Sequence, residues 1–582
     1  MMSDNLNIHI CKNRNSSDLL EIDCLSYGFR KPVYGSGELK EYIELFSRLV
    51  SENQKKLKYI VSDTLTRIEG RTYFFDKLSK YVQLVELIEG EQRNIRIKNL
   101  DRILFKALAK YLKQRKIAYE GVGPGAFAEA KRVLRFPARV ALMFVIDSLI
   151  AFICKRALPK DKRREYDHLV LSFYDYRCSR SGAYCDSYFQ PLIEHLVKEG
   201  KDIMVLSTPI ITDNPRHFIS YMANLREMIR CFKNLRKECE VKFYYCFLTM
   251  GDLLKSYIIG MGSFVRVRQA IRYHGIDIRY LLNLSLADDY LACYWGYAWK
   301  QYFMFKRLFR DFNIRGSIIY PYENHPWEKL LVAARNESGA GTKLTAFQHT
   351  SFSFKLLQYF PGSYESGLPF YPDKILTVGD ILRDVMNEAG SYKDGLVESG
   401  CALRHGYLFS DRDGGRKKDF CGKIAYAFSF DTKVYEGVIR SLVEVFEGTG
   451  YTVYLKIHPI VPEEAVIKTK LPENIIPAKH MKWDDLFKEI DILIYDDNSL
   501  GIEALRYGVD VAYFSLADRI YDCDRLFKYE GDKKIINSIE ELRAYIKGYY
   551  EGAARKGRDD FDAEYIYRYF LPVTRERLEK FI

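Results

Sequence analysis

Apolar runs of roughly four to eight residues alternate with amphipathic stretches along most of the chain, as strands alternate with helices. The runs after residue 160 are HLVLSF, DIMVLS, GSIIYP, TKLTAF and DKILTV, and a second series follows residue 421 with CGKIAYAF, YTVYLKI, DILIY and VDVAYF. Strands separated by helices form parallel sheets. The pattern therefore predicts an α/β protein with two tandem Rossmann-like domains, and a ligand cleft between two sets of strand carboxyl ends.

The chain has 582 residues, which is too long for a single hydrophobic core. The polar, glycine-containing stretch SDRDGGRKKD begins at Ser410 and marks a boundary between the two series. We therefore predict an N-terminal acceptor-side domain over 1–409, a linker over 410–421, a nucleotide-donor domain over 422–545 and a helical C-terminal segment over 546–582.

One apolar stretch, Val140 to Cys154, is interrupted only by Asp147 and Ser148 and has arginines and lysines on both sides over 132–164. It is shorter than the roughly 20 apolar residues that a spanning helix needs. Two interpretations stay open: a buried core helix, or a helix that contacts the inner-membrane surface with its basic flanks on anionic headgroups.

The net charge and the cysteine pattern limit the classes of binding partner and the cellular compartment that we expect. The net charge is +12, from 89 Lys and Arg against 77 Asp and Glu, which favours anionic partners such as nucleotide phosphates. No zinc-finger spacing or RNA-recognition signature is present, so nucleic acid is not expected. The 12 cysteines include no C-x-x-C pair, and no apolar leader follows the first methionine. We therefore expect a cytoplasmic protein with reduced thiols.

Polar residues follow the predicted strand DILIY, in the stretch Asp496, Asp497, Asn498 and Ser499, and a helix carrying Glu503 comes next. Asn498 or Ser499 suits the helix N-cap, and free amides at a helix start attract phosphate. Glu503 is placed to accept hydrogen bonds from a ribose diol. The alternative is an ordinary capped helix whose glutamate faces solvent.

The strand YTVYLKI ends at His458-Pro459. Proline at a strand end can be simple punctuation, but a histidine at the carboxyl edge of a sheet can also contact phosphate. We expect His458 and Ser499 to lie on neighbouring strands at one sheet edge. Lys456, two residues earlier, is a further donor contact and is expected to be exposed.

The N-terminal series supplies candidate acceptor residues. Tyr322, Glu323, Asn324 and His325 lie between a strand and a helix, and His349 with Thr350 follows the next strand. Adjacent parallel strands would bring His349 near Glu323, so either could be the general base, with Tyr322, His325 and Thr350 contacting the acceptor. The alternative is that Asn324 caps the helix and the other residues are incidental.

A third polar loop, at Asp175 and Arg177, follows the strand HLVLSF. Asp175 is a further candidate for acceptor activation, and Arg177 for binding an anionic acceptor, although surface arginines often only solvate. The aspartates of DRDGG fall in the linker rather than beside a buried strand. No metal and no cofactor are therefore expected.

The stretches KIHP at 456–459 and DILIYDDNSLGIEA at 491–504 resemble the C-terminal domain of GT-B glycosyltransferases. The resemblance extends over roughly residues 160 to 530 and is to enzymes of bacterial surface polysaccharide: capsule and lipopolysaccharide Kdo transferases, polysialyltransferases and CDP-glycerol glycerophosphotransferases. It implies that His458 and Ser499 contact the donor phosphate and that Glu503-Ala504 binds the ribose. Asn498-Ser499 stands where many members have Ser-Ser or Ser-Thr, which leaves the donor open.

The resemblance implies a metal-independent glycosyltransferase, with a CMP- or CDP-linked donor and a glycan or lipid-linked glycan acceptor. It also implies a location in the cytoplasm, on the cytoplasmic face of the inner membrane. Three alternatives remain: an alditol-phosphate transferase, a nucleotide-sugar 2-epimerase and a non-catalytic subunit of the polysaccharide machinery.

Overall fold

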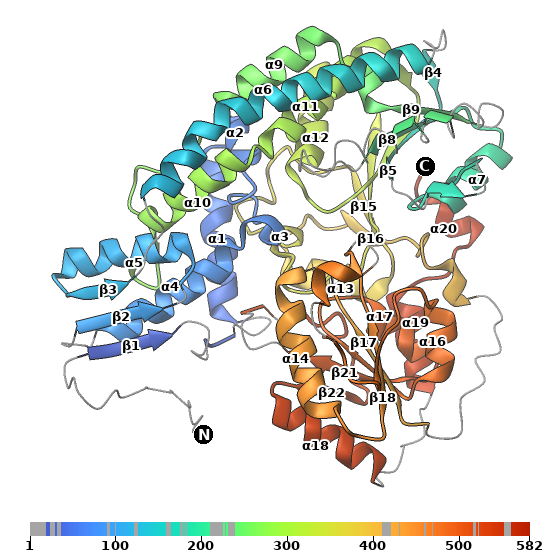
Figure 1. Ribbon diagram of the computed structural model, residues 1–582. Helices are drawn as coiled ribbons and strands as arrows, with labels where there is room; N and C mark the ends of the chain where they lie inside the picture. The colour runs from blue at the N-terminus through green and yellow to red at the C-terminus, as the bar shows by residue number, and fades with distance from the viewer. Residues whose placement is uncertain are drawn as a thin grey trace.

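The structure is a computed structural model (Figure 1). It describes residues 19–23, 29–31, 36–89, 94–98, 100–121, 126–158, 164–174, 178–180, 183–209, 225–226, 229–230, 239–409, 421–429, 431–458, 461–467, 470–515, 520–521, 523–551 and 560–582. Asp175, Arg177, Pro459 and the linker as far as residue 420 lie outside these ranges, so the predictions made for them stay predictions.

The first apolar series forms a seven-stranded parallel sheet in the order β16-β15-β14-β13-β5-β8-β9. Its strands are β5 (His168–Tyr174), β8 (Ile203–Pro209), β9 (Glu240–Phe243), β13 (Ser317–Pro321), β14 (Lys343–Gln348), β15 (Lys374–Thr377) and β16 (Val397–Ser399). β13 and β14 are buried almost throughout, as continuous apolar runs predict for a sheet covered on both faces.

The second series forms a six-stranded parallel sheet in the order β19-β18-β17-β20-β21-β22. Its strands are β17 (Lys423–Ala427), β18 (Thr452–Lys456), β19 (Ile475–Pro477), β20 (Ile492–Tyr495), β21 (Asp510–Phe514) and β22 (Lys533–Ile536). Two parallel, helix-covered sheets in tandem make the GT-B fold, so the predicted fold class is confirmed. The exact domain limits stay a prediction.

A third, smaller parallel sheet lies in the first 121 residues, in the order β1-β2-β3. Its strands are β1 (Leu19–Asp23), β2 (Asn94–Lys98) and β3 (Tyr119–Gly121). Figure 1 places it beside α4 (Phe74–Glu89) and α5 (Arg102–Arg115), apart from the two larger sheets. The elements β2, α5 and β3 form a strand–helix–strand unit.

The helices follow the amphipathic stretches. Their bounds are α1 (Gly37–Glu52), α2 (Leu57–Ile60), α3 (Glu69–Thr72), α4 (Phe74–Glu89), α5 (Arg102–Arg115), α6 (Ala126–Ala157), α7 (Gln190–Lys198), α9 (Met250–Met261), α10 (Arg279–Ala292), α11 (Trp295–Asp311), α12 (Pro326–Ser338), α13 (Asp380–Ala389), α14 (Tyr435–Phe446), α15 (Glu463–Val466), α16 (Trp483–Glu489), α17 (Leu500–Arg506), α18 (Ile539–Tyr550), α19 (Asp560–Tyr569) and α20 (Arg575–Glu579). Two-stranded pairs join β4 (Glu165–Tyr166) to β12 (Asn313–Ile314), β6 (Ser179–Arg180) to β7 (Ala183–Tyr184), and β10 (Arg272–Tyr273) to β11 (Ile276–Asp277).

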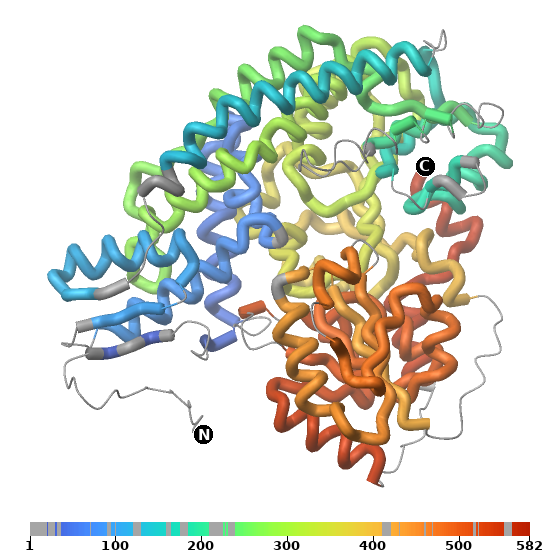
Figure 2. The backbone as a smooth tube through the Cα atoms, viewed as in Figure 1, coloured from blue at the N-terminus to red at the C-terminus, as the bar shows by residue number. Residues whose placement is uncertain are grey.

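The C-terminal segment returns to the N-terminal sheet after the second sheet is complete. The Leu571 amide donates to the Val378 carbonyl (2.9 Å), directly after β15. The Phe581 ring packs on Phe347 of β14, with ring centroids 5.2 Å apart. Figure 2 follows this red segment out of the C-terminal sheet and up to the other half of the chain. The two halves are therefore tied together by the chain end as well as by the residues between the sheets.

The apolar stretch 140–154 lies in α6, a helix that is long and apolar enough by length and composition to cross a membrane. Only 22% of its apolar stretch is buried inside the protein. The interpretation of this segment as a buried core helix is therefore wrong, because one side of the helix, with Leu142, Val145, Leu149 and Phe152, is exposed.

Candidate functional site

The loop between β13 and α12 carries Glu323, and its backbone N–H groups donate to the carboxylate of Glu328. Glu328 in the first turn of α12 accepts backbone N–H groups from Glu323 (3.1 Å), Asn324 (2.9 Å) and His325 (3.2 Å). Asn324 adopts a left-handed conformation with φ 55°, and its amide donates to the Gln358 carbonyl (2.6 Å). The N-cap of α12 is His325, so the interpretation of Asn324 as the cap is wrong.

One histidine hydrogen-bonds to the Glu323 carboxylate, and a second lies beside it. His325 Nε2 lies 2.7 Å from Oε2, and His349 Nε2 lies 3.4 Å from Oε1. His349 follows β14, which pairs with β13 in the sheet, so the predicted proximity of His349 to Glu323 is confirmed. The glutamate side chain is 34% exposed, whereas those of His325 and His349 are 15% and 5% exposed. The carboxylate is thus the accessible member of the group.

The contact with Arg404 assigns the proton on the His349 ring. The guanidinium of Arg404 can only donate, and it lies 3.3 Å from Nδ1 of His349, so that nitrogen must accept. The proton of His349 is then on Nε2, facing Glu323. His325 also directs Nε2 at the carboxylate. Both imidazoles therefore direct Nε2 at one carboxylate.

This arrangement sets the charge at the site. Partial burial would raise the pKa of Glu323, but the hydrogen bonds and charge of His325 and His349 hold it well below its ordinary value. Burial lowers the pKa of His349, and Glu323 opposes that shift. At neutral pH Glu323 is therefore an ionised carboxylate, oriented by His325 and His349, which can accept a proton or stabilise developing positive charge.

Two further residues of this cluster, Tyr188 and Arg404, were not predicted. The Tyr188 ring meets the His349 ring edge-to-face at 4.9 Å, and the Arg404 guanidinium lies 4.7 Å above the same tyrosine. Asp186 fixes Tyr188 by accepting its backbone N–H (2.8 Å). In the sequence, Arg404 could have been found as part of the polar pair Arg404-His405, which follows β16. That strand has only three residues, so its sequence does not stand out as a strand.

The remaining acceptor candidates are placed less favourably. Tyr322 is 1% exposed, and its hydroxyl lies 3.2 Å from that of Tyr392 inside the core. Thr350 is half-buried, and its hydroxyl donates to the neighbouring Ser351 carbonyl (3.2 Å). Their acceptor roles stay predictions, and the buried Tyr322 has almost no surface to offer an acceptor.

On the second sheet, the ends of three strands are joined at one edge. Ser429, after β17, donates its backbone N–H to Asp496 after β20 (3.0 Å), and its carbonyl accepts the Tyr435 hydroxyl (2.8 Å). That hydroxyl in turn accepts the backbone N–H of His458 after β18 (3.2 Å). His458 and Asp496 therefore share an edge. The strands before His458 and Ser499 are β18 and β20, and β17 lies between them, so the expectation of neighbouring strands for His458 and Ser499 is wrong.

Lys456 is buried rather than exposed, contrary to expectation, with 7% of its surface accessible. Its ammonium donates to the carbonyls of Ala478 (3.0 Å) and Lys479 (2.9 Å). Burial lowers the pKa of Lys456. These contacts hold the segment after β19 against the sheet, and the predicted donor-binding role of Lys456 stays a prediction.

Asn498 organises the start of α17. Its side-chain oxygen accepts the backbone N–H of Leu500 (3.0 Å), and its amide donates to the carbonyl of Ala427 at the end of β17 (2.8 Å). Ser499 occupies the N-cap position without a capping hydrogen bond from its own side chain and is half-buried. Asn498 is therefore the capping side chain.

Asp497 lies in a buried ion pair between the two halves of the chain. Its carboxylate meets Lys355 Nζ (2.8 Å) from the segment after β14 and Arg525 Nη2 (2.6 Å) from the segment after β21. Arg525 also donates to the Ser351 carbonyl (2.7 Å). The side chains of Asp497 and Lys355 are 2% and 4% exposed. These contacts show that loops at the carboxyl ends of β14 and β20 touch.

Glu503 makes a second contact between the halves. Its carboxylate accepts the hydroxyl of Tyr407 (2.7 Å), and Arg506 of the same helix donates to the Leu408 carbonyl (3.0 Å). Glu503 is 9% exposed, so the interpretation of a solvent-facing glutamate is wrong. Burial raises the pKa of Glu503 to about 7, and the Tyr407 hydroxyl opposes that shift. The tyrosine supplies a hydroxyl donor of the kind that a ribose diol would supply.

Glu503→Gln should flatten the pH dependence of stability between about pH 5 and 7. A carboxyl whose pKa is raised on folding contributes stability that is present below pH 4.5 and lost as the pH rises through about 7. The free energy of unfolding of the wild type should fall as the pH rises from 5 to 8. Because the glutamine cannot ionise, the variant should lose about 1–3 kcal/mol less over the same range. Urea unfolding at both pH values measures this difference.

The exposed Glu436 on α14 offers the control, since Glu436→Gln should leave the pH profile of stability unchanged. If Glu503→Gln has the same profile as the wild type, Glu503 titrates normally and is not buried in solution.

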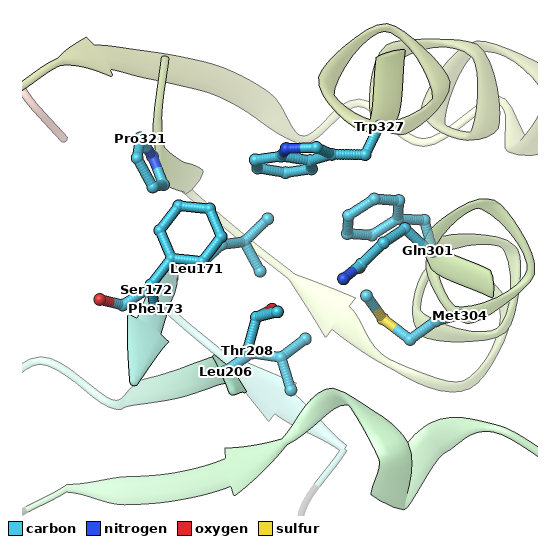
Figure 3. A pocket seen from close by; sticks show the side chains of 10 residues that line it. Leu171, Ser172, Phe173, Leu206, Thr208, Gln301, Met304, Pro321 and Trp327 are labelled. Atoms are coloured by element: carbon cyan, nitrogen blue, oxygen red, sulfur yellow. The ribbon is translucent and has the colours of Figure 1, made fainter. Parts of the chain in front are cut away.

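A small cavity lies beneath the Glu323 loop (Figure 3). It is bounded by Pro321 before the loop and Trp327 after it, together with side chains of β5, β8 and α11. Its lining is Leu171, Ser172, Phe173, Leu206, Thr208, Gln301, Met304, Phe305, Pro321 and Trp327. The largely apolar lining and the absence of the Glu323 cluster from it identify a packing gap rather than the ligand site.

No family model matches the chain, and no curated protein matches it by sequence. UDP-GlcNAc 2-epimerase from Neisseria meningitidis bound to UDP-GlcNAc is 8% identical, with 69% of this chain and 93% of that one covered and a TM-score of 0.35. MurG from Acinetobacter baumannii is 10% identical, with 66% and 90% covered and a TM-score of 0.34. The lipopolysaccharide outer core galactosyltransferase WaaB is 8% identical, with 71% and 98% covered and a TM-score of 0.39. Likeness at this level carries no argument about activity.

Proposed function

We propose that the chain is a glycosyltransferase that moves a sugar from a nucleotide-activated donor to a glycan or lipid-linked glycan. The observation that carries the proposal is the Glu323 carboxylate, one-third exposed and oriented by His325 and His349 at the carboxyl edge of the N-terminal sheet. Carboxyl edges of parallel sheets are where open α/β folds bind ligands. An ionised, oriented carboxylate there suits activation of an acceptor hydroxyl.

The donor is assigned to the second sheet. His458, Ser499 and Glu503 follow β18 and β20, near the edge where Ser429 and Tyr435 link the strand ends. In this proposal His458 and Ser499 contact the phosphates, and Glu503 accepts the ribose hydroxyls in place of Tyr407. The ligand would then favour the ionised form of Glu503, so nucleotide binding should release protons near pH 7. A cytidine nucleotide is proposed from the family resemblance.

A nucleotide screen tests the donor assignment. CMP, CDP, UMP, UDP and GDP are compared by thermal shift and calorimetry, because a ligand at about 100 times its dissociation constant stabilises by about 2.7 kcal/mol. We expect one nucleotide to bind, and His458→Ala to weaken it by about 10–100-fold through loss of a charge-assisted hydrogen bond. His480 is an exposed histidine in the same half of the chain, so His480→Ala is the matched control.

The outcomes separate the alternatives. A bound nucleotide sugar that changes configuration with no acceptor present indicates a 2-epimerase. Transfer of glycerol or ribitol phosphate from a cytidine nucleotide indicates an alditol-phosphate transferase, in which phosphorus rather than the anomeric carbon is attacked. If no nucleotide binds the wild type, the transferase proposal fails, and a non-catalytic role in polysaccharide assembly becomes the better explanation.

A further inference from the structure

Two neighbouring helices, α6 and α9, expose an unusually large set of apolar side chains. On α6 these form a stripe with helical spacing, and on α9 a second stripe lies beside it. The exposed side chains, here called the apolar face, are Val133, Leu134, Leu142, Val145, Leu149 and Phe152 of α6, Met250, Leu254, Ile258, Ile259 and Met261 of α9, and Phe264. Contacts join α6 to α9 and α9 to α11, and Figure 2 shows these helices along the side of the molecule away from the C-terminal sheet.

The opposite side of α6 is bound to the rest of the protein by a buried ion pair. Asp147 pairs with Lys300 of α11 (2.6 Å) and accepts the Tyr245 hydroxyl (2.6 Å), and the side chains of Asp147 and Lys300 are 5% and 6% exposed. A spanning orientation would separate Asp147 from these partners and place a carboxylate in hydrocarbon, which is costly. α6 therefore exposes one face to solvent while its other face stays bound to α11.

α9 is fixed in the same way. Gly260 packs against the Trp295 ring so closely that a Cβ at this position would lie 1.9 Å from a ring carbon. Asp252 in the first turn pairs with Arg307 of α11 (2.7 Å). Because its inner side is specified by these contacts, the outward side of α9, with Ile258 55% exposed, is a defined surface rather than a loosely packed helix.

The exposed charges of the segments 130–157 and 250–268 are positive. Over 130–157 and 250–268 the acidic residues are Asp147 and Asp252, and both are ion-paired inside. The exposed basic residues of these segments are Lys131, Arg135, Lys155, Arg156, Lys255, Arg266 and Arg268. An apolar surface with a cationic border complements an anionic lipid surface, where apolar side chains enter the acyl boundary and lysines and arginines meet the headgroups.

We propose that α6 and α9 together dock the protein on an anionic lipid bilayer, lying on the membrane surface without spanning it. α9 supplies five of the twelve side chains of this surface, so the apolar stretch at 140–154 does not act alone. The docking surface does not depend on the transferase assignment, because none of its residues belongs to the Glu323 cluster or to the proposed donor contacts.

Vesicle flotation of the purified full chain tests the docking surface. Phosphatidylcholine vesicles with and without phosphatidylglycerol are compared for the wild type, Val145→Asp/Phe152→Asp on α6, and Ile258→Asp on α9. We expect the wild type to bind the anionic vesicles. The partition coefficient of each variant should fall by about tenfold or more, because an apolar side chain that enters the membrane is replaced by a charged one. Bound protein should also transfer to a second vesicle population, which a spanning protein would not do.

Ile535→Asp and Tyr567→Asp are the matched controls, since these side chains are 48% and 47% exposed in the C-terminal half and should leave vesicle binding unchanged. Nucleotide binding measured on the same variants should be unaltered, which separates this proposal from the proposed function. The proposal is overturned if the wild type ignores anionic vesicles, if Ile258→Asp binds like the wild type, or if the protein is a dimer in solution that the α6 and α9 variants dissociate.

Discussion

Glu323→Gln is expected to lower the turnover number by about 10²–10⁴-fold, the range for loss of a general base, with nucleotide affinity unchanged. The glutamine keeps the size of the side chain and an oxygen that can accept from His325 and His349, so the loop held by Glu328 should retain its shape. What is lost is the negative charge, which lies against the imidazoles of His325 and His349. An acceptor hydroxyl then has no ionised carboxylate to take its proton.

Turnover is measured with whichever nucleotide-activated sugar binds in the screen, and the folded state is checked by thermal unfolding. NMR titration gives a readout independent of activity: the pKa of His349, which Glu323 raises against the effect of burial, should fall further in the variant. Glu398 on β16, paired with Lys374, provides the control Glu398→Gln in the same sheet. Unchanged turnover in Glu323→Gln would remove this residue from the chemistry.

Asp497→Ala is expected to lower the free energy of unfolding by about 3–5 kcal/mol, the usual effect of removing one partner from a buried ion pair. The alanine leaves Lys355 and Arg525 buried without a counter-charge, and their side chains are only 4% and 11% exposed. Because these charges join the loops after β14 and β20, the two halves of the chain should also lose cooperativity. Urea unfolding followed by fluorescence should then show two transitions in place of one.

Replacement of the whole group by apolar residues distinguishes charge imbalance from loss of packing. The triple variant Lys355→Met, Asp497→Leu and Arg525→Met leaves no unpaired charge and should recover most of the lost stability. Breaking the exposed pair of Arg440 with Glu436 by Glu436→Ala should change stability by less than about 1 kcal/mol. If Asp497→Ala lowers the free energy of unfolding no more than Glu436→Ala does, the Asp497 ion pairs are exposed to solvent in solution.

Local patterns in the sequence were enough for the fold class and for part of the site. Continuous apolar runs determined the buried strands, because a strand covered on both faces needs apolar residues at every position. The polar loops after those strands contained Glu323, His325 and His349, and the parallel arrangement implied that the ends of β13 and β14 meet. These inferences depend on short-range spacing, which a sequence displays directly.

Only the tertiary structure decided the rest, because it depends on contacts between residues far apart in the chain. Strand order put β17 between β18 and β20, and no periodicity reports which strands pair. Asp497 and Glu503 meet Lys355 and Tyr407 across the boundary between the halves, so their burial could not be read from their own neighbours in sequence. Likewise α6 and α9 are apolar on several sides, and only the packing of Asp147 and Gly260 against α11 shows which side remains outside.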